Sequence, residues 1–403
     1  MEVIVPQFIV SDEFATPHDY GVLLSSSITA DATARWVAGT TYAENDLVTL
    51  CEPADSSEPG IIKKYKSLQS ANTGNNPYSS PTHWVSLGAT ERYKMFDLFT
   101  DSATTVDGDI NVKLYCKRIN AIAFLNVQAS GITINAYIGN ELTDIGIEYS
   151  GAGTDLTFTD MTSIVRASGS FTTDGFKAGD LITVSGSTSN DGTYRILLIR
   201  DSGTRMLVLP NSLTPESGIS GTAITIAPIK STTIALEDQL YSWEDYFFGD
   251  FQYTSDVSQD IVIQGVNDMV IDITFHQYDS GIDCFVGHCI PGRKYDIGET
   301  LWSPTTSIET FGRIIEDPHF GYTYLKQGNF KKLLEVDLKI PTDRANIVNN
   351  VLTQLREIPT LYQANQNDTS YNGLLVYGYY DDMKITYETH NYIEGRLSIR
   401  GMV

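Results

Sequence analysis

Apolar and polar residues alternate with a period of two along much of the chain. The alternation is clearest at 132–138, 261–263, 270–275 and 336–340, and turn residues separate these runs. Such alternation is typical of β-strands that turn one face to a core and the other to solvent. Many short strands joined by turns predict a mainly β protein whose body is a multi-domain β-sandwich or jelly roll.

One segment late in the chain has helical spacing instead. Its apolar residues recur at intervals of three and four: Ile347, Val348, Val351, Leu352 and Leu355. Thr342 or Asp343 can cap the start and Pro359 ends the segment. The spacing predicts one helix over about 342–356.

Changes in composition divide the chain into a body and two inserted modules. We expect 35–88 and 155–228 to be small β-modules, and the rest to form one body: 1–34, 89–154 and 229–403 with its late helix. In the second module, Gly179-Asp180 suits a hairpin turn that needs a positive φ. Its aromatic residues are expected to form its core: Phe171, Phe176 and Tyr194.

The charge balance narrows the possible partners. The chain has 403 residues and a net charge of −23, with 27 basic and 50 acidic side chains. Phosphate backbones and anionic lipid repel such a chain, so we expect no nucleic-acid partner and no binding to membrane surfaces. No apolar run approaches the ~20 residues of a membrane span. The segment Met1–Pro6 lacks the basic start and apolar core of a signal peptide, and we expect a protein made and folded in the cytosol without its own export signal.

The first module carries the most specific motif. It runs Trp36-Val37-Ala38-Gly39-Thr40-Thr41-Tyr42, then Asn45-Asp46-Leu47-Val48, Lys64-Tyr65-Lys66, Asn72–Pro77 and finally Thr82-His83-Trp84. This order resembles the small type-3 chitin-binding module of carbohydrate-binding families 5 and 12, over about 53 residues. The resemblance implies a compact β-fold that binds a polysaccharide.

Sugar rings stack their C–H faces on exposed aromatic rings, and nearby polar groups hydrogen-bond the hydroxyls. By this reasoning Tyr42, Tyr65 and Tyr78 are candidate stacking residues. The candidate polar partners are Lys66, Asn75 and Asn76. A module this small needs large side chains to fill its interior. We therefore expect its two tryptophans to be core: Trp36 and Trp84.

The body has its own set of motifs. They are Glu91–Asp97 (ERYKMFD), the apolar strand 119–127, the aromatic box at 243–248 and the C-terminal Leu397–Val403. Together with 171–194, their order resembles tail proteins of tailed bacteriophages. The resemblance implies a virion component at the tail tip or baseplate. Its partners would be other phage tail proteins and copies of itself, and the first module would contact either host cell-surface polysaccharide or a neighbouring subunit.

The search for catalytic and metal motifs finds little. Cys284 and Cys289 have no second ligand pair downstream, so we expect a buried strand and no zinc site. Far-apart cysteines also predict no disulfide framework. Asp101, Asp107 and Asp109 depart from a calcium-loop spacing and are expected in a solvated turn.

No cofactor or metal is expected, and we expect no enzyme. The alternative is a polysaccharide-degrading enzyme, a glycosidase or depolymerase with an accessory binding module. Its catalysis would need a pair of carboxylates in an open groove, for which Asp245 and Asp256 are unexceptional candidates among 50 acidic residues.

Overall fold

The computed structural model confirms a mainly β protein made of several sheets. The residues that it describes are 1–11, 20–52, 60–99, 102–138, 148–150, 155–219, 221–236, 255–261, 268–278, 281–301, 303–316, 322–326, 328–364, 374–386 and 392–402. Most of the predicted strand 261–263, the aromatic box at 243–248, Asp101 and Asp245 lie outside these residues.

A six-stranded sheet forms one layer of the body. Its strands, in spatial order, are β2 (Ile9–Ser11), β3 (Gly21–Ser26), β10 (Ile110–Lys117), β23 (Asp268–His276), β12 (Gly131–Ile138) and β21 (Lys230–Ala235). The predicted strands at 132–138 and 270–275 are the neighbours β12 and β23, paired antiparallel.

A long second sheet forms the other layer. Its path is β22 (Val257–Asp260), β11 (Ala121–Gln128), β24 (Cys284–Asp296), β1 (Glu2–Pro6), β30 (Thr360–Gln363), β31 (Leu375–Thr386), β32 (Tyr392–Gly401), β29 (Phe330–Pro341) and β25 (Glu299–Thr300), with β9 (Thr104–Val106) paired to β24 and β26 (Thr305–Thr310) paired to β29. The β11–β24 part packs on the six-stranded sheet around one apolar core. Phe124 and Phe275 meet edge to face across it, with ring centroids 5.2 Å apart.

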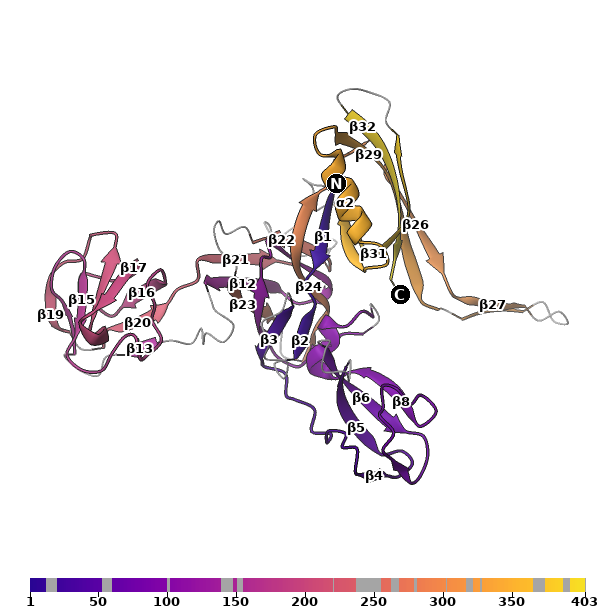
Figure 1. The fold of residues 1–403 in the computed structure, drawn as a ribbon, viewed down its shortest axis with the longest axis horizontal. Helices are drawn as coiled ribbons and strands as arrows, with labels where there is room; N and C mark the ends of the chain where they lie inside the picture. The colour runs from indigo at the N-terminus through magenta and orange to yellow at the C-terminus, as the bar shows by residue number, and fades with distance from the viewer. Residues whose placement is uncertain are drawn as a thin grey trace, which may run out of the picture.

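The other half of the long sheet packs on the predicted helix, which is α2 (Ala345–Gln354). Val348 and Leu352 are buried against the sheet, as the spacing predicted, but Ile347 is exposed. The predicted N-cap, Thr342 or Asp343, is wrong, because Arg344 occupies the N-cap position and no side-chain cap hydrogen bond forms. The body is therefore a β-sandwich that continues into a helix-covered sheet (Figure 1).

Both modules are inserted between paired strands of the six-stranded sheet. The first lies between β3 and β10, and contains β4 (Thr41–Tyr42), β5 (Leu47–Glu52), β6 (Ile61–Ser67), β7 (Asn72–Thr73) and β8 (Trp84–Ala89). The second lies between β12 and β21, which pair antiparallel. Figure 1 shows the two modules projecting from different sides of the body.

The second module is one eight-stranded sheet around its own core. Its strands, in spatial order, are β13 (Glu148–Ser150), β20 (Ala223–Ile226), β16 (Leu181–Ser185), β17 (Gly192–Arg200), β18 (Arg205–Leu209), β15 (Ser163–Arg166), β14 (Leu156–Phe158) and β19 (Glu216–Ile219). Because β13 belongs to it, the module begins before the predicted boundary at 155. Phe171, Phe176 and Tyr194 are buried in its core, and Gly179 has a φ of 99° at the predicted turn.

A β-hairpin arm leaves the long sheet between β26 and β29. Two further strands extend it, β27 (Arg313–Glu316) and β28 (Thr323–Lys326), which pair with each other alone among the described strands. Figure 1 shows this arm reaching away from the body on the side opposite the second module. Within the described residues, no helix is long and apolar enough to span a membrane.

Candidate functional site

The first module is built around the aromatic residues of its motif. The antiparallel strands β5, β6 and β8 form a sheet, and β4 pairs with β7 beside it. Tyr42, Val48, Tyr65 and Trp84 form the core, and Trp36 packs against it half-buried. The Tyr42 and Trp84 rings meet edge to face, with centroids 5.2 Å apart. Both tryptophans thus contribute to the core of the module, Trp84 within it and Trp36 packed against it.

Hydrogen bonds within the module occupy several polar groups of the predicted sugar site. Trp84 Nε1 donates to the Asn75 carbonyl oxygen at 2.9 Å, and Asn75 Nδ2 donates to Asn72 Oδ1 at 2.8 Å. The Tyr42 hydroxyl accepts a hydrogen bond from the Val37 amide at 2.8 Å. The two bonds of Asn75 hold the 72–78 loop on the core.

The three candidate stacking residues differ in how far their side chains are exposed. Tyr42 is 9% exposed and Tyr65 is 4% exposed, whereas Tyr78 is 56% exposed. A buried ring has no free face for a sugar, so burial removes Tyr42 and Tyr65 from the predicted stacking set. Their rings fill the interior because a module this small needs large side chains to build a core.

The remaining candidates, of which Tyr78 is exposed and Asn76 and Lys66 are half-buried, lie on two parts of the module. The Asn76 side-chain oxygen accepts a hydrogen bond from the Tyr78 amide at 2.9 Å, which fixes the turn that presents Tyr78. Lys66 lies on β6, opposite Leu47 of β5 and Val85 of β8, both of which are exposed. The predicted sugar-binding surface is therefore reduced to the Tyr78 ring on a loop and the Lys66 side chain between two apolar residues of the sheet.

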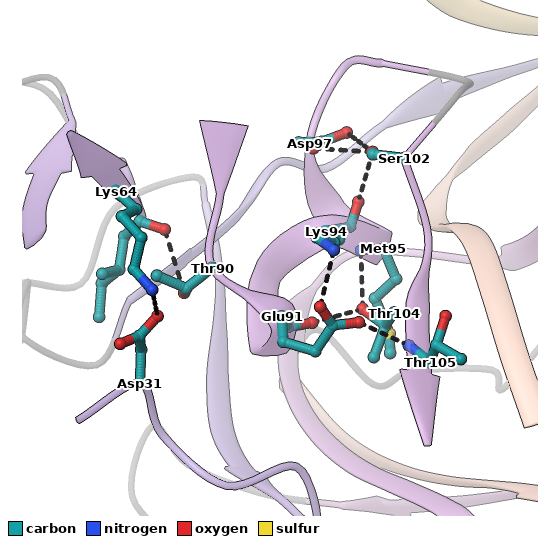
Figure 2. A network of polar contacts seen from close by, with 11 residues as sticks. Asp31, Lys64, Thr90, Glu91, Lys94, Met95, Asp97, Ser102, Thr104 and Thr105 are labelled. Carbon is teal, nitrogen blue, oxygen red and sulfur yellow. Dashed lines mark hydrogen bonds and ion pairs between the residues drawn. The ribbon is translucent and has the colours of Figure 1, made fainter. Parts of the chain in front are cut away.

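A polar joint connects the module to the body. The ERYKMF segment forms a 3₁₀ helix, η1 (Glu91–Phe96), directly after β8. The Glu91 carboxylate forms an ion pair with Lys94 at 2.7 Å and accepts a hydrogen bond from the Thr105 amide at 2.8 Å. Thr104 donates from its hydroxyl to the Glu91 carbonyl at 2.8 Å. The hydrogen bonds of Glu91 with Thr104 and Thr105 fasten η1 to β9, a strand of the long sheet (Figure 2).

The joint continues on the module side. Lys64 of β6 forms an ion pair with Asp31 at 2.6 Å, and the Thr90 hydroxyl donates to the Ile62 carbonyl (Figure 2). Partial burial raises the pKa of Asp31, but hydrogen bonds from Lys64 and Thr33 outweigh it and lower that pKa to about 2. Part of the tail-like ERYKMFD motif thus has a structural role, which is to join module and body.

A cavity of about 370 Å³ lies at the base of the arm. Its lining includes His288, Asp256, Lys332 and Tyr377 among apolar side chains. His288 is buried with Nε2 lacking a hydrogen-bond partner. Burial lowers the pKa of His288 to about 4, against the opposing charge of Asp256. Asp256 itself accepts a hydrogen bond from the Asn126 amide at 2.8 Å and pairs with Lys332 at 3.4 Å.

The cysteine cluster lies in a buried strand, as predicted. Cys284 and Cys289 are on β24 and both are buried. Burial raises the pKa of Cys284 to about 11, which keeps its thiol protonated. Among the described residues no group of three or more His, Cys, Asp or Glu side chains is placed to hold a metal ion. Asp107 and Asp109 instead accept hydrogen bonds from Gln277.

The arm is a second candidate surface, and the sequence pattern missed it. Its large apolar side chains are exposed: Ile308, Phe311, Ile314, Ile315, Tyr322, Tyr324, Leu325 and Phe330. In sequence these residues look like ordinary buried strands. The one available signal is local, since basic residues stand among them at 313, 326, 331 and 332 in an acidic chain.

Comparison with known proteins establishes no family. No protein-family model matches the chain, and no curated protein matches it. One of the solved structures with some similarity is the phage phi92 endosialidase. It shares 8% sequence identity at a TM-score of 0.19, covering 98% of this chain and 75% of that one. A TM-score this low does not establish a shared fold.

Proposed function

We propose that the chain is a structural subunit of a bacteriophage tail, positioned at the tail tip or baseplate. It is made in the host cytoplasm, is carried on the virion, and assembles with other tail proteins and with copies of itself. The motifs of the body and the presence of two modules on one sandwich support this function. The alternating apolar residues form the β-sheets of the body, and a β-sheet body is what the proposed tail subunit requires.

The exposed arm carries the proposal. Soluble monomers rarely expose contiguous apolar surface beyond a few hundred Å², and larger patches mark interaction sites. Here eight large apolar side chains are exposed along one two-stranded ribbon. A ribbon of two strands is only marginally stable alone in water. The arm therefore suits a protein that functions inside an assembly.

The first module would contact the host surface or a neighbouring subunit. Tyr78 offers an exposed ring, and Asn76 and Lys66 offer polar groups on the same module. Tyr78→Ala should weaken binding to insoluble chitin or to host polysaccharide if sugar is the ligand. Val37→Ala is a matched control, because Val37 is also 56% exposed and lies in the same module. Equal binding by both variants would favour the neighbouring subunit.

A polysaccharide-degrading enzyme is less well supported. Glycosidases use two carboxyl groups roughly 5–9.5 Å apart. The described lining of the cavity beside His288 includes one carboxylate, Asp256, which forms an ion pair with Lys332. The described lining of the groove between the first module and the body includes one carboxylate, Asp97, which accepts hydrogen bonds from Ser102. Among the residues that the structure describes, neither lining has the pair that the alternative requires.

The test is to locate the chain in particles. Mass spectrometry of purified virions of the phage that encodes it should find the chain in fixed ratio to other tail proteins. Deleting its gene should give particles with incomplete tails in electron micrographs. Intact, infectious particles that lack the chain would overturn the proposed function.

A further inference from the structure

The arm separates from the body at a definite point. Strand β29 pairs with β32 from Pro341 back to Leu333, where Leu333 lies opposite Arg400. Toward its start, at Phe330, β29 is paired with β26 alone. From there to the β27–β28 hairpin the ribbon has two strands and two free edges within the described residues. Both faces and both edges are available to another molecule.

The two faces of the outer hairpin differ. Residues directly opposite each other in a sheet share a face. Ile314 lies opposite Leu325, and these side chains are 67% and 78% exposed. Ile315 and Tyr324 share the opposite face, and both are exposed. A single flat surface cannot cover both faces, so the partner must enclose the ribbon.

The exposed apolar surface is large enough for a stable contact. With about 200 Å² for a large side chain, the eight residues at their observed exposures amount to on the order of 900 Å². A standard protein interface buries about 800 Å² on each partner. The arm alone therefore offers the area that one side of a specific interface needs.

The charges of the hairpin point to an acidic partner. Arg313 lies directly opposite Lys326, so two cations share a face. Like charges in this position are destabilising. No ion pair in the described part of the chain joins either residue to an acid. Acidic groups on a partner would relieve this repulsion and complement the pair.

We propose that the arm binds a second copy of this chain, and this rests on the proposed function of a tail subunit. The chain supplies the required complement, because its net charge is −23 while the arm segment 305–332 holds four basic and three acidic residues. The arm of one copy then contacts the acidic body of the next. Such a head-to-tail contact uses two different surfaces, and it generates a ring if the rotation closes.

The oligomeric state of the purified full chain tests the inference. Light scattering coupled to size exclusion, over roughly 1–100 μM, should show a concentration-dependent oligomer for the wild type. The double variant Ile314→Asp/Leu325→Asp should be a monomer. Leu197→Asp is the matched control, since Leu197 is 57% exposed in the second module, and it should remain oligomeric.

A charge variant keeps the test independent of ribbon folding. Arg313→Glu/Lys326→Glu retains the apolar pairs, and it should dissociate the oligomer at least tenfold more readily. The wild-type oligomer should weaken as salt rises from 50 to 500 mM, because exposed charge pairs are screened. A wild type that is monomeric throughout, or an oligomer unchanged in both double variants, would overturn the inference.

Measurements on particles separate this inference from the proposed function. A monomeric wild type whose arm variant fails to enter virions would show that another tail protein binds the arm. In that case the inference fails and the proposed function stands. If the chain forms an oligomer through its arm but is absent from virions, the inference stands and the proposed function fails.

Discussion

Tyr65 and Tyr78 allow a sharp test of how the first module is organised. Tyr65 is 4% exposed on β6, in contact with the core that contains Trp84, and Tyr78 is 56% exposed on a loop. Replacing a buried aromatic residue by alanine costs about 3–5 kcal/mol, because the transfer energy is lost and a cavity remains. Replacing an exposed one costs within about 0.5 kcal/mol.

These magnitudes are decisive for a module of this size. At ~0.05–0.15 kcal/mol per residue, a module of about 50 residues has roughly 3–8 kcal/mol of stability. Tyr65→Ala should therefore remove most of it. Hydrogen exchange of the full chain reports this by region, since amides exchange through local opening. Protection in β5, β6 and β8 should fall by roughly 10²–10⁴-fold, or to the unprotected limit.

The body is the internal control in the same experiment. Strands β10 and β23 belong to a separate core and should keep their protection in both variants. Tyr78→Ala should change protection in the module by less than about threefold. If Tyr65→Ala leaves β6 protected within threefold, or if Tyr78→Ala exposes it, the assignment of core and surface is refuted.

Three further predictions concern the joint, the helix and the buried histidine. Asp31→Asn should lower module stability by about 1 kcal/mol at neutral pH. Since the folded-state pKa of Asp31 is about 2 against an ordinary 3.8, the difference from wild type should shrink as pH falls below 4 and vanish below pH 2 in urea titrations. Leu352→Ala should cost about 2–5 kcal/mol in denaturant unfolding, and Ile347→Ala within about 0.5; equal losses would contradict the observed helix face. His288 has its pKa lowered from 6.5 to about 4, so wild-type stability should decrease by up to about 3 kcal/mol as pH falls from 6.5 to 4, and His288→Phe should flatten that slope; parallel pH profiles would contradict this.

The position of the two modules explains how one body can carry them. Each begins and ends at neighbouring antiparallel strands, β3 with β10 and β12 with β21. The two ends of each insertion are therefore close in space, and the sheet is complete without the module. An insertion of this kind leaves the core of the body intact, while the polar joint at Glu91 and Thr104 fixes how the first module is attached.

The spacing of apolar residues along the chain was sufficient to predict several strands and the helix. The period-two runs became β12 and β23, and the helical spacing became α2. Phe171, Phe176 and Tyr194 were also predicted as core residues of the second module, and all three are buried in its core. In these cases backbone geometry and side-chain period point to the same answer.

Tertiary structure decided which apolar and aromatic residues are covered. Tyr65 and Tyr78 look alike in the motif, but only the packing of β6 on Trp84 buries the first. Likewise Ile314 and Leu325 have the apolar character of a core strand, and they are exposed because no other described strand packs on the arm. Hydrophobicity shows that a surface should be covered, but what covers it depends on contacts between residues far apart in the chain or on another molecule.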